Sequence, residues 1–214
     1  LVSLESVNAA RTANPDTQFV SIGDREADIY DLFLAERVVG VDLLVRAIQD
    51  RRVEHEEHYL WAAVAAAPLA TTIRLHVPRQ PDHPKRVAQI EIRWQEIALR
   101  PPHKRKTERL PIISVWAVWA QEIGAPEGVE LIEWMLLTTR AVQSTEEALE
   151  CLAWYACRWG IEVWHKILKS GCQIEARQLE SAERLKRLLT LCSVVAWRIL
   201  YATMLARALP AASC

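Results

Sequence analysis

Four β-prone segments follow one another through the middle of the chain, and they constrain its fold more than any other feature. Each is rich in β-branched and aromatic residues, and Pro-rich or basic turns separate them. They cover residues 71–77, 87–94, 112–119 and 131–138. So many short strands in a row, without intervening helical periodicity, predict a β-rich subdomain.

Helical and strand patterns alternate on both sides of this subdomain. Helical periodicity is expected over 4–10, 27–36, 144–169 and about 182–205. Two further strands are expected at 18–23 and 41–46, the second of them buried. The order predicts an α/β fold in which residues 1–50 and 140–214 form the core and residues 51–139 a β-rich insertion.

Composition is that of a globular protein. Of the 214 residues, 51% are hydrophobic and 25% charged, and the formal net charge is −1. The five cysteines form no Cys-x2-Cys pair, which argues against a structural zinc site or a disulfide framework. No run is expected to reach the roughly 18 apolar residues of a membrane span, and no secretory signal is visible. We therefore expect a cytoplasmic protein without a membrane partner.

One charged stripe stands out in the C-terminal helical region. Its members fall within an arc of about 80° at helical spacing, and they are Tyr155, Arg158, Glu162, Lys166 and Lys169. Apolar residues occupy the other side. The stripe places one carboxylate among groups that suit a phosphate backbone, which is the layout of a nuclease-like site. Solvated faces are the usual explanation of such stripes.

An acidic motif lies near the N-terminus. The β-prone run ends at Gly23, and the next five residues read Asp-Arg-Glu-Ala-Asp, from Asp24 to Asp28. An Asp at a strand end projects into the crevice where α/β sheets place their chemistry. The alternative is that Asp24 only caps the helix that follows.

Together, the two motifs resemble those of the bacterial DDE transposases of insertion-sequence family four, the Tn-five-like group. Their C-terminal block reads Tyr-x2-Arg-x3-Glu-x6-Lys, and the chain reproduces it without a gap from Tyr155 to Lys169. Their second catalytic Asp lies in an Asp-Arg-Glu-Ala-Asp motif. The resemblance covers nearly the whole chain and implies an RNase H-like core with an all-β insertion, as the order of the segments also suggests.

The resemblance implies metal-dependent DNA cleavage and strand transfer at transposon ends. Asp24 and Glu162 would be catalytic metal ligands for Mg²⁺ or Mn²⁺ in a two-ion site. Double-stranded DNA, both transposon ends and target, would be the partner of a homodimer in the full-length family. The DNA phosphates next to the cut would contact Tyr155, Arg158, Lys166 and Lys169.

Further DNA contacts are implied outside the block. Trp134 matches a Trp that stacks on a flipped base in the Tn-five member, although most of the nine Trp must lie in the core. Arg46 matches a DNA-contacting Arg more weakly. Basic residues of the insertion can bind phosphates or remain solvated at loop tips, namely Arg79, Lys85, Arg86, Arg93 and residues 103–106.

The chain departs from the family in one important respect. The first catalytic Asp should end an early strand, but only Asp16, in a loop-like segment, lies upstream of Asp24. The family's N-terminal DNA-binding region has no counterpart either. We therefore expect the C-terminal part of a transposase, inactive alone, or alternatively a catalytically inactive DNA-binding or inhibitory remnant.

Two other metal patterns fail. In the zinc-protease-like segment His55-Glu-Glu-His58, the two His are three residues apart instead of four. The pair of Glu162 and His165 resembles half of a di-iron site, but the chain holds no second Glu-x-x-His.

Overall fold

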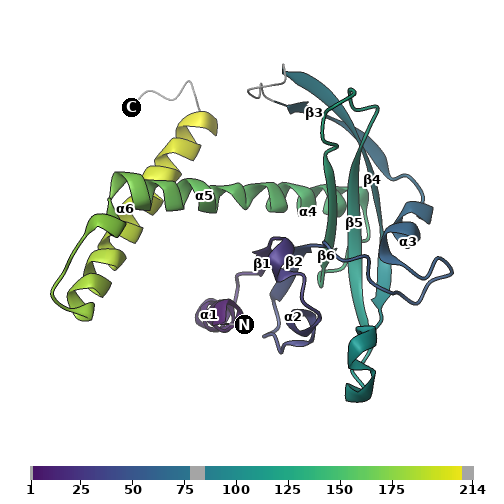
Figure 1. Cartoon of the computed structure of the whole chain (residues 1–214), viewed down its shortest axis with the longest axis horizontal. Helices are drawn as coiled ribbons and strands as arrows, with labels where there is room; N and C mark the ends of the chain where they lie inside the picture. The colour runs from purple at the N-terminus through teal and green to yellow at the C-terminus, as the bar shows by residue number, and fades with distance from the viewer. Residues whose placement is uncertain (1, 78–84, 209–214) are drawn as a thin grey trace. The chain divides into compact units, whose positions relative to one another are not determined.

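A computed structural model describes residues 2–77 and 85–208 of the chain (Figure 1). It divides into two compact units, Leu1–Tyr155 and Ala156–Cys214. The first contains every strand of the described residues, and the second is helical. A mixed α/β fold, as predicted, is confirmed.

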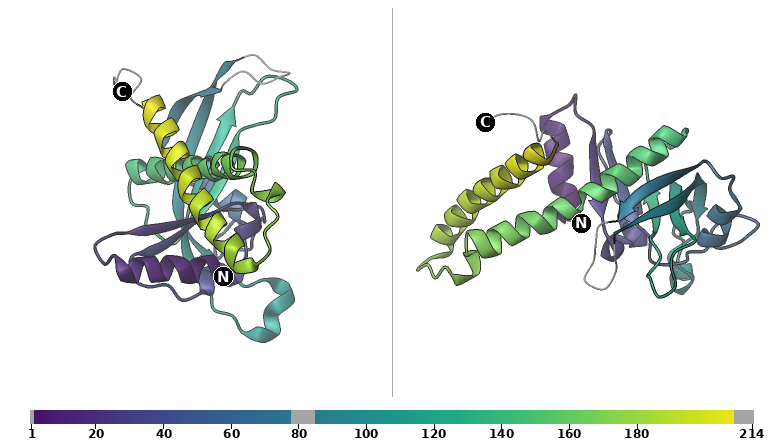
Figure 2. Two further views of the ribbon diagram at one scale, coloured as in Figure 1. Left: turned by 90° about the vertical axis from the view of Figure 1, so that its left-hand side faces the viewer. Right: turned by 90° about the horizontal axis from the view of Figure 1, so that it is seen from above.

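The first unit is built on one six-stranded mixed sheet of order β1-β2-β6-β5-β4-β3. Only β1 and β2 are parallel, and every other neighbouring pair is antiparallel. The sheet is curled, as Figure 2 shows. Its strands are β1 (Phe19–Gly23), β2 (Val41–Arg46), β3 (Thr71–Val77), β4 (Arg86–Leu99), β5 (Ile113–Ile123) and β6 (Glu133–Thr138).

The strands of the predicted insertion thus continue the sheet of β1 and β2. The link is the antiparallel pair of β2 and β6, in which Leu44 lies opposite Thr138. The division into a core and an insertion at residues 51 and 139 remains a prediction.

Each face of the sheet carries its own hydrophobic core, because successive side chains of a strand point to opposite faces. On one face, residues such as Leu43 and Leu137 pack with three helices, α1 (Val2–Ala13), α2 (Tyr30–Leu34) and α3 (Leu60–Ala66). On the other, Leu44 and Leu136 belong to a cluster with α4 (Thr145–Cys157). We call this second side the α4 face. Figure 1 shows α4 crossing it.

The predicted helix over 27–36 is broken in two. A short 3-10 helix, η1 (Arg25–Ala27), precedes α2, and Asp28 between them has φ −72° and ψ 63°. The reason is tertiary: the Asp28 carboxylate accepts hydrogen bonds from the backbone N–H groups of Ile48 and Gln49, which lie just after β2. Because Asp28 makes these bonds, its backbone leaves the helical conformation and the helix is interrupted there.

Two elements of the first unit were not predicted. The apolar helix α3 has no side-chain cap at its N-terminus, and it is held by burial of Leu60, Ala63 and Val64. The basic run at 103–106 forms most of a second 3-10 helix, η2 (His103–Glu108), between β4 and β5.

The second unit consists of helices from residue 156 onward. Its elements are α5 (Trp159–Lys166), the π-helical turn η3 (Ile167–Gly171), the 3-10 turn η4 (Ile174–Ala176) and α6 (Ala182–Ala208). The α6 helix packs on α5 and η3, with Leu168 and Ala196 buried between them. The Trp164 indole N–H donates to the Ser193 carbonyl at 3.3 Å.

The α6 helix is more apolar than the sequence analysis expected. The segment Ala182–Ala206 is long and apolar enough to cross a membrane. Its most apolar stretch has a mean hydropathy of 1.7, and only 11% of that stretch is buried. The expectation that no segment reaches this length and apolarity is therefore wrong. Length and composition alone do not separate a membrane span from a helix that other protein covers.

Candidate nucleic-acid interface

Asp24 lies where the sequence predicted, directly after the carboxyl end of β1. Its Oδ1 accepts a hydrogen bond from the Glu26 backbone N–H at 3.0 Å, so it caps η1. The side chain is half-buried. The capping alternative is thus observed, and it is compatible with a further role because a carboxylate accepts several hydrogen bonds.

Gly23 fixes the approach of η1 to the strand end. A Cβ on Gly23 would lie 2.4 Å from the Cβ of Ala27, closer than two carbon atoms can come. Only a glycine lets the chain fold back this tightly after β1. The position of Asp24 therefore depends on the residue before it.

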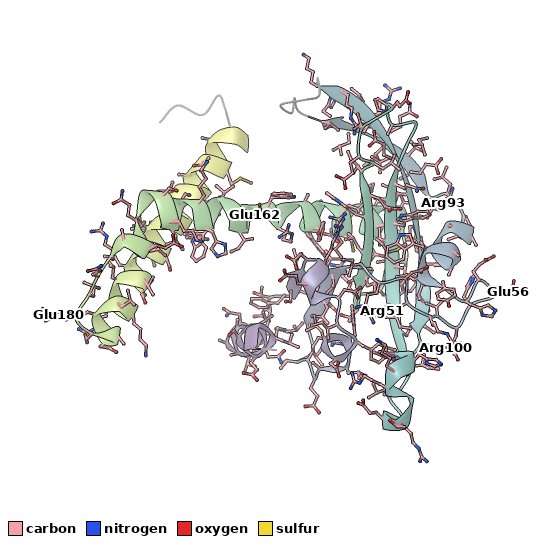
Figure 3. The ribbon with its side chains drawn as sticks, viewed as in Figure 1. Arg51, Glu56, Arg93, Arg100, Glu162 and Glu180 are labelled. Atoms are coloured by element: carbon pink, nitrogen blue, oxygen red, sulfur yellow. The ribbon has the colours of Figure 1, made fainter. Side chains whose placement is uncertain are left out.

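The second aspartate of the motif has a different environment. Asp28 is 2% exposed and pairs with Arg51, itself 8% exposed, at 2.6 Å. Arg51 is labelled in Figure 3. With its two backbone donors, this ion pair ties η1 to the segment after β2. Sequence reasoning missed the pair. Its only signal is an Asp in the motif and an Arg that follows the buried strand.

Arg46 ends β2 beside the end of β1. The parallel register ends with Gly23 opposite Val45, the residues directly before Asp24 and Arg46. Because Leu44 points to the α4 face, alternation assigns Arg46 to that face too. The Arg46 guanidinium donates to the Glu133 carbonyl at 2.8 Å, directly before Trp134.

Trp134 and Tyr155 also meet on the α4 face. Their rings are in edge contact, with centroids 5.1 Å apart and planes at 68°. Tyr155, on α4, is 2% exposed, whereas Trp134 is half-buried. The predicted DNA-contacting Tyr thus has a packing role, because it supports the Trp134 ring from the side. Asp24, Arg46, Trp134 and Tyr155 form what we call the strand-end cluster of the first unit.

The remaining predicted residues belong to the second unit. A guanidinium nitrogen of Arg158 lies 3.4 Å from Glu162 Oε1, one helical turn away. Glu162 and Lys166 are both exposed. The stripe of the sequence analysis therefore includes one internal ion pair.

Lys169 does not continue that stripe at α-helical spacing. It lies in the π-helical turn η3, whose wider turn advances each residue by less rotation than an α-helix does. Its ammonium group pairs with Glu175 Oε1 at 3.0 Å, and both side chains are largely exposed. Such a solvated pair contributes little to stability.

Two arginines of the predicted basic group are paired within the sheet. Arg86 forms an ion pair with Glu122, which is 4% exposed. Arg93 pairs with Glu91 at 3.1 Å and donates to the Ala67 carbonyl. Lys85 is exposed, while Arg79 lies outside the described residues. Arg86 and Arg93 thus serve the fold.

In residues 2–77 and 85–208 no group of three or more His, Cys, Asp or Glu is arranged to hold a metal ion. Asp24 and Glu162 do offer the donor type that Mg²⁺ and Mn²⁺ prefer, a hard carboxylate oxygen. Asp24 belongs to the first unit and Glu162 to the second.

No protein-family model matches the chain.

Proposed function

We propose that the chain belongs to a bacterial DDE transposase with an RNase H-like core. Its reaction would be metal-dependent cleavage and transfer of DNA strands at transposon ends. The observation that carries the proposal is the strand-end cluster, in which Asp24 follows a parallel strand beside Arg46. A carboxylate, a guanidinium and an aromatic ring at one end of a sheet suit a metal ion, a phosphate and a base.

The proposed roles follow from charge and exposure. Asp24 and Glu162 would each offer a carboxylate ligand for Mg²⁺ or Mn²⁺, which when bound would stabilise the charge of the reacting phosphate oxygens. Arg158, already 3.4 Å from Glu162, would hold a phosphate oxygen beside that carboxylate. The exposed ammonium groups of Lys166 and Lys169 would bind neighbouring phosphates as point charges.

The half-buried Trp134 would receive an extruded base on its exposed part, with Tyr155 fixing the ring from its buried side. Holding the ring before the base arrives lowers the ordering cost of stacking. The role of Tyr155 in this proposal is therefore positioning, in addition to the phosphate contact that the family block implies.

A second candidate is a non-catalytic fragment that binds DNA or inhibits a full-length partner. It is favoured because the carboxylates of Asp24 and Glu162 already interact with other groups of the chain. Asp24 caps η1 at 3.0 Å, and Glu162 Oε1 lies 3.4 Å from a guanidinium nitrogen of Arg158. In this alternative the cationic residues would keep their DNA contacts, and no metal would bind at the carboxylates.

Both candidates predict DNA binding by the second unit. We would measure the affinity for a fluorescent duplex by anisotropy between 50 and 200 mM salt, comparing Lys169→Ala with Lys186→Ala, an exposed lysine on α6. Removing one phosphate contact should lower the slope of log K against log salt by roughly 0.9. Loss of affinity in Lys169→Ala only would support the proposal. Equal behaviour of the two variants, or no binding by the parent chain, would contradict it.

A further inference from the structure

A basic pocket lies at the end of the sheet where η2 connects β4 to β5. It has a volume of about 400 Å³. Figure 3 shows Arg100 at this end of the sheet. The polar side chains that line it are Arg52, Glu54, Arg100, His103, Arg105 and Arg109. Four guanidinium groups thus face one carboxylate in a concave site.

The backbone around the pocket is well fixed. The Arg100 N–H donates to the Arg52 carbonyl at 2.8 Å, and the Glu54 N–H donates to the Ala98 carbonyl at 2.9 Å. Between these bonds, Val53 is 1% exposed and forms a bridge with Leu99. Arg52 and Arg100 are therefore held side by side on a rigid scaffold, which lowers the cost of binding a ligand between them.

The charges in the pocket are only partly neutralised. Arg105 is held by Asp31 and Glu108, at 2.7 and 2.6 Å. Arg100 lies 3.5 Å from Glu54. In the described part of the chain no ion pair involves Arg52 or Arg109.

Two features of the pocket's arginines are unusual. The Nε of Arg100 is buried without a hydrogen-bond partner, which is rare because an unsatisfied buried donor is costly. Arg109 has φ 49° and ψ 40°, in the left-handed region that a bulky side chain seldom adopts. Arg109 is the C-cap of η2, and residues in sparsely populated backbone regions cluster at binding sites.

From this pocket we infer an anion-binding site for a phosphate group, with Arg52, Arg100 and Arg109 as its ligands. Planar guanidinium groups match phosphate oxygens in pairs, and Arg109 would close the site from the end of η2. The site does not depend on the proposed transposase function. The phosphate could belong to a nucleic-acid backbone or to a free anion.

The test is calorimetric titration of the whole chain with inorganic phosphate at low salt. Arg52→Ala should weaken binding about tenfold, since a charge-assisted hydrogen bond is lost. Glu54→Gln should tighten it, because the carboxylate opposing the anion is neutralised. Arg74→Ala, which removes an exposed positive charge on β3, serves as the matched control and should leave the affinity unchanged. No binding, or equal effects of Arg52→Ala and Arg74→Ala, would overturn the site.

Arg109→Gly separates binding from folding. Glycine relieves the left-handed backbone, so the thermal midpoint should rise by about 2 °C while phosphate affinity falls. A variant that loses affinity only because it unfolds would show a lower midpoint, which would count against the site.

The source of the phosphate follows from competition. If inorganic phosphate displaces a fluorescent single-stranded oligonucleotide from the chain, and Arg52→Ala abolishes that competition, the ligand is a nucleic-acid backbone. Phosphate binding without displacement assigns the pocket to a free anion. DNA that stays bound under saturating phosphate also leaves the proposed contacts of the second unit intact.

Discussion

Arg51 holds the Asp28 carboxylate through two hydrogen bonds, at 2.6 and 3.0 Å, where both residues are buried. Asp24, four residues earlier in the same acidic motif, is half-buried and caps a single 3-10 turn. The motif thus contains one aspartate that the fold needs and one at the surface of a strand end.

Asp28→Ala should cost about 3–5 kcal/mol of unfolding free energy, because it leaves the Arg51 charge buried and unpaired. Urea denaturation measures the loss. Asp24→Ala is the matched change, and removing its cap should cost about 1 kcal/mol. Similar losses in the two variants would contradict the division of roles.

Gly23→Ala should displace η1 from the end of β1, since the new Cβ would collide with Ala27. Overpacking of this kind costs about 1–3 kcal/mol. The second change Ala27→Gly removes the colliding atom, so it should restore part of the stability in the Gly23→Ala background. In the parent chain the same change should only destabilise. If Ala27→Gly destabilises both backgrounds equally, the close approach is not the cause.

The Trp134–Tyr155 contact should appear as a coupling energy. Edge-to-face aromatic pairs contribute about 0.5–1.5 kcal/mol beyond burial, so a double-mutant cycle of Trp134→Ala and Tyr155→Ala should be non-additive by that amount. Urea unfolding of the four proteins provides the values. Strict additivity would show that Tyr155 does not support the Trp134 ring.

The buried thiol of Cys151 should make the chain less stable at alkaline pH. Burial raises the pKa of its thiol from 9.0 to about 11, with Arg140 opposing the shift. Well below pH 9 the thiol is protonated in both the folded and the unfolded chain. Between pH 9 and 11 the unfolded chain releases the proton first, so stability falls as pH rises.

By pH 10.5 the titration of Cys151 should have lowered the unfolding free energy by about 2 kcal/mol. Cys151→Ala removes the titration, and its stability should therefore fall less between pH 7.5 and 10.5 than that of the parent chain. Cys157→Ala, which changes an exposed thiol, should fall as the parent does. Parallel curves for the parent and Cys151→Ala would refute the assignment.

Local pattern was sufficient for the strands and for the larger helices. The strands at 41–46 and 71–77 have the predicted bounds, because β-branched residues in a short run specify a strand locally. β4 extends five residues beyond its predicted end at Trp94, since those residues pair with β5 in a long antiparallel hairpin. Such pairing is tertiary and leaves no local signal.

The placement of a site residue was predictable where it depends only on the residue's position along a strand. The sequence indicated that Asp24 follows one strand and that Arg46 ends the next, and the structure pairs these two strands in parallel. The burial of Tyr155 was not predictable, because helical periodicity gives an angle but not the element that covers it. Nor did any residue pattern indicate the π turn that contains Lys169.

The most direct test of the proposed function is Mn²⁺ binding, followed by electron paramagnetic resonance with duplex DNA present. Asp24→Asn and Glu162→Gln keep the size of each side chain, and Asn retains the cap of η1. Glu26→Gln changes an exposed carboxylate beside Asp24 and serves as the control. A catalytic site predicts that the first two variants lose bound Mn²⁺ and that the control does not. Equal Mn²⁺ binding by all four proteins would contradict it.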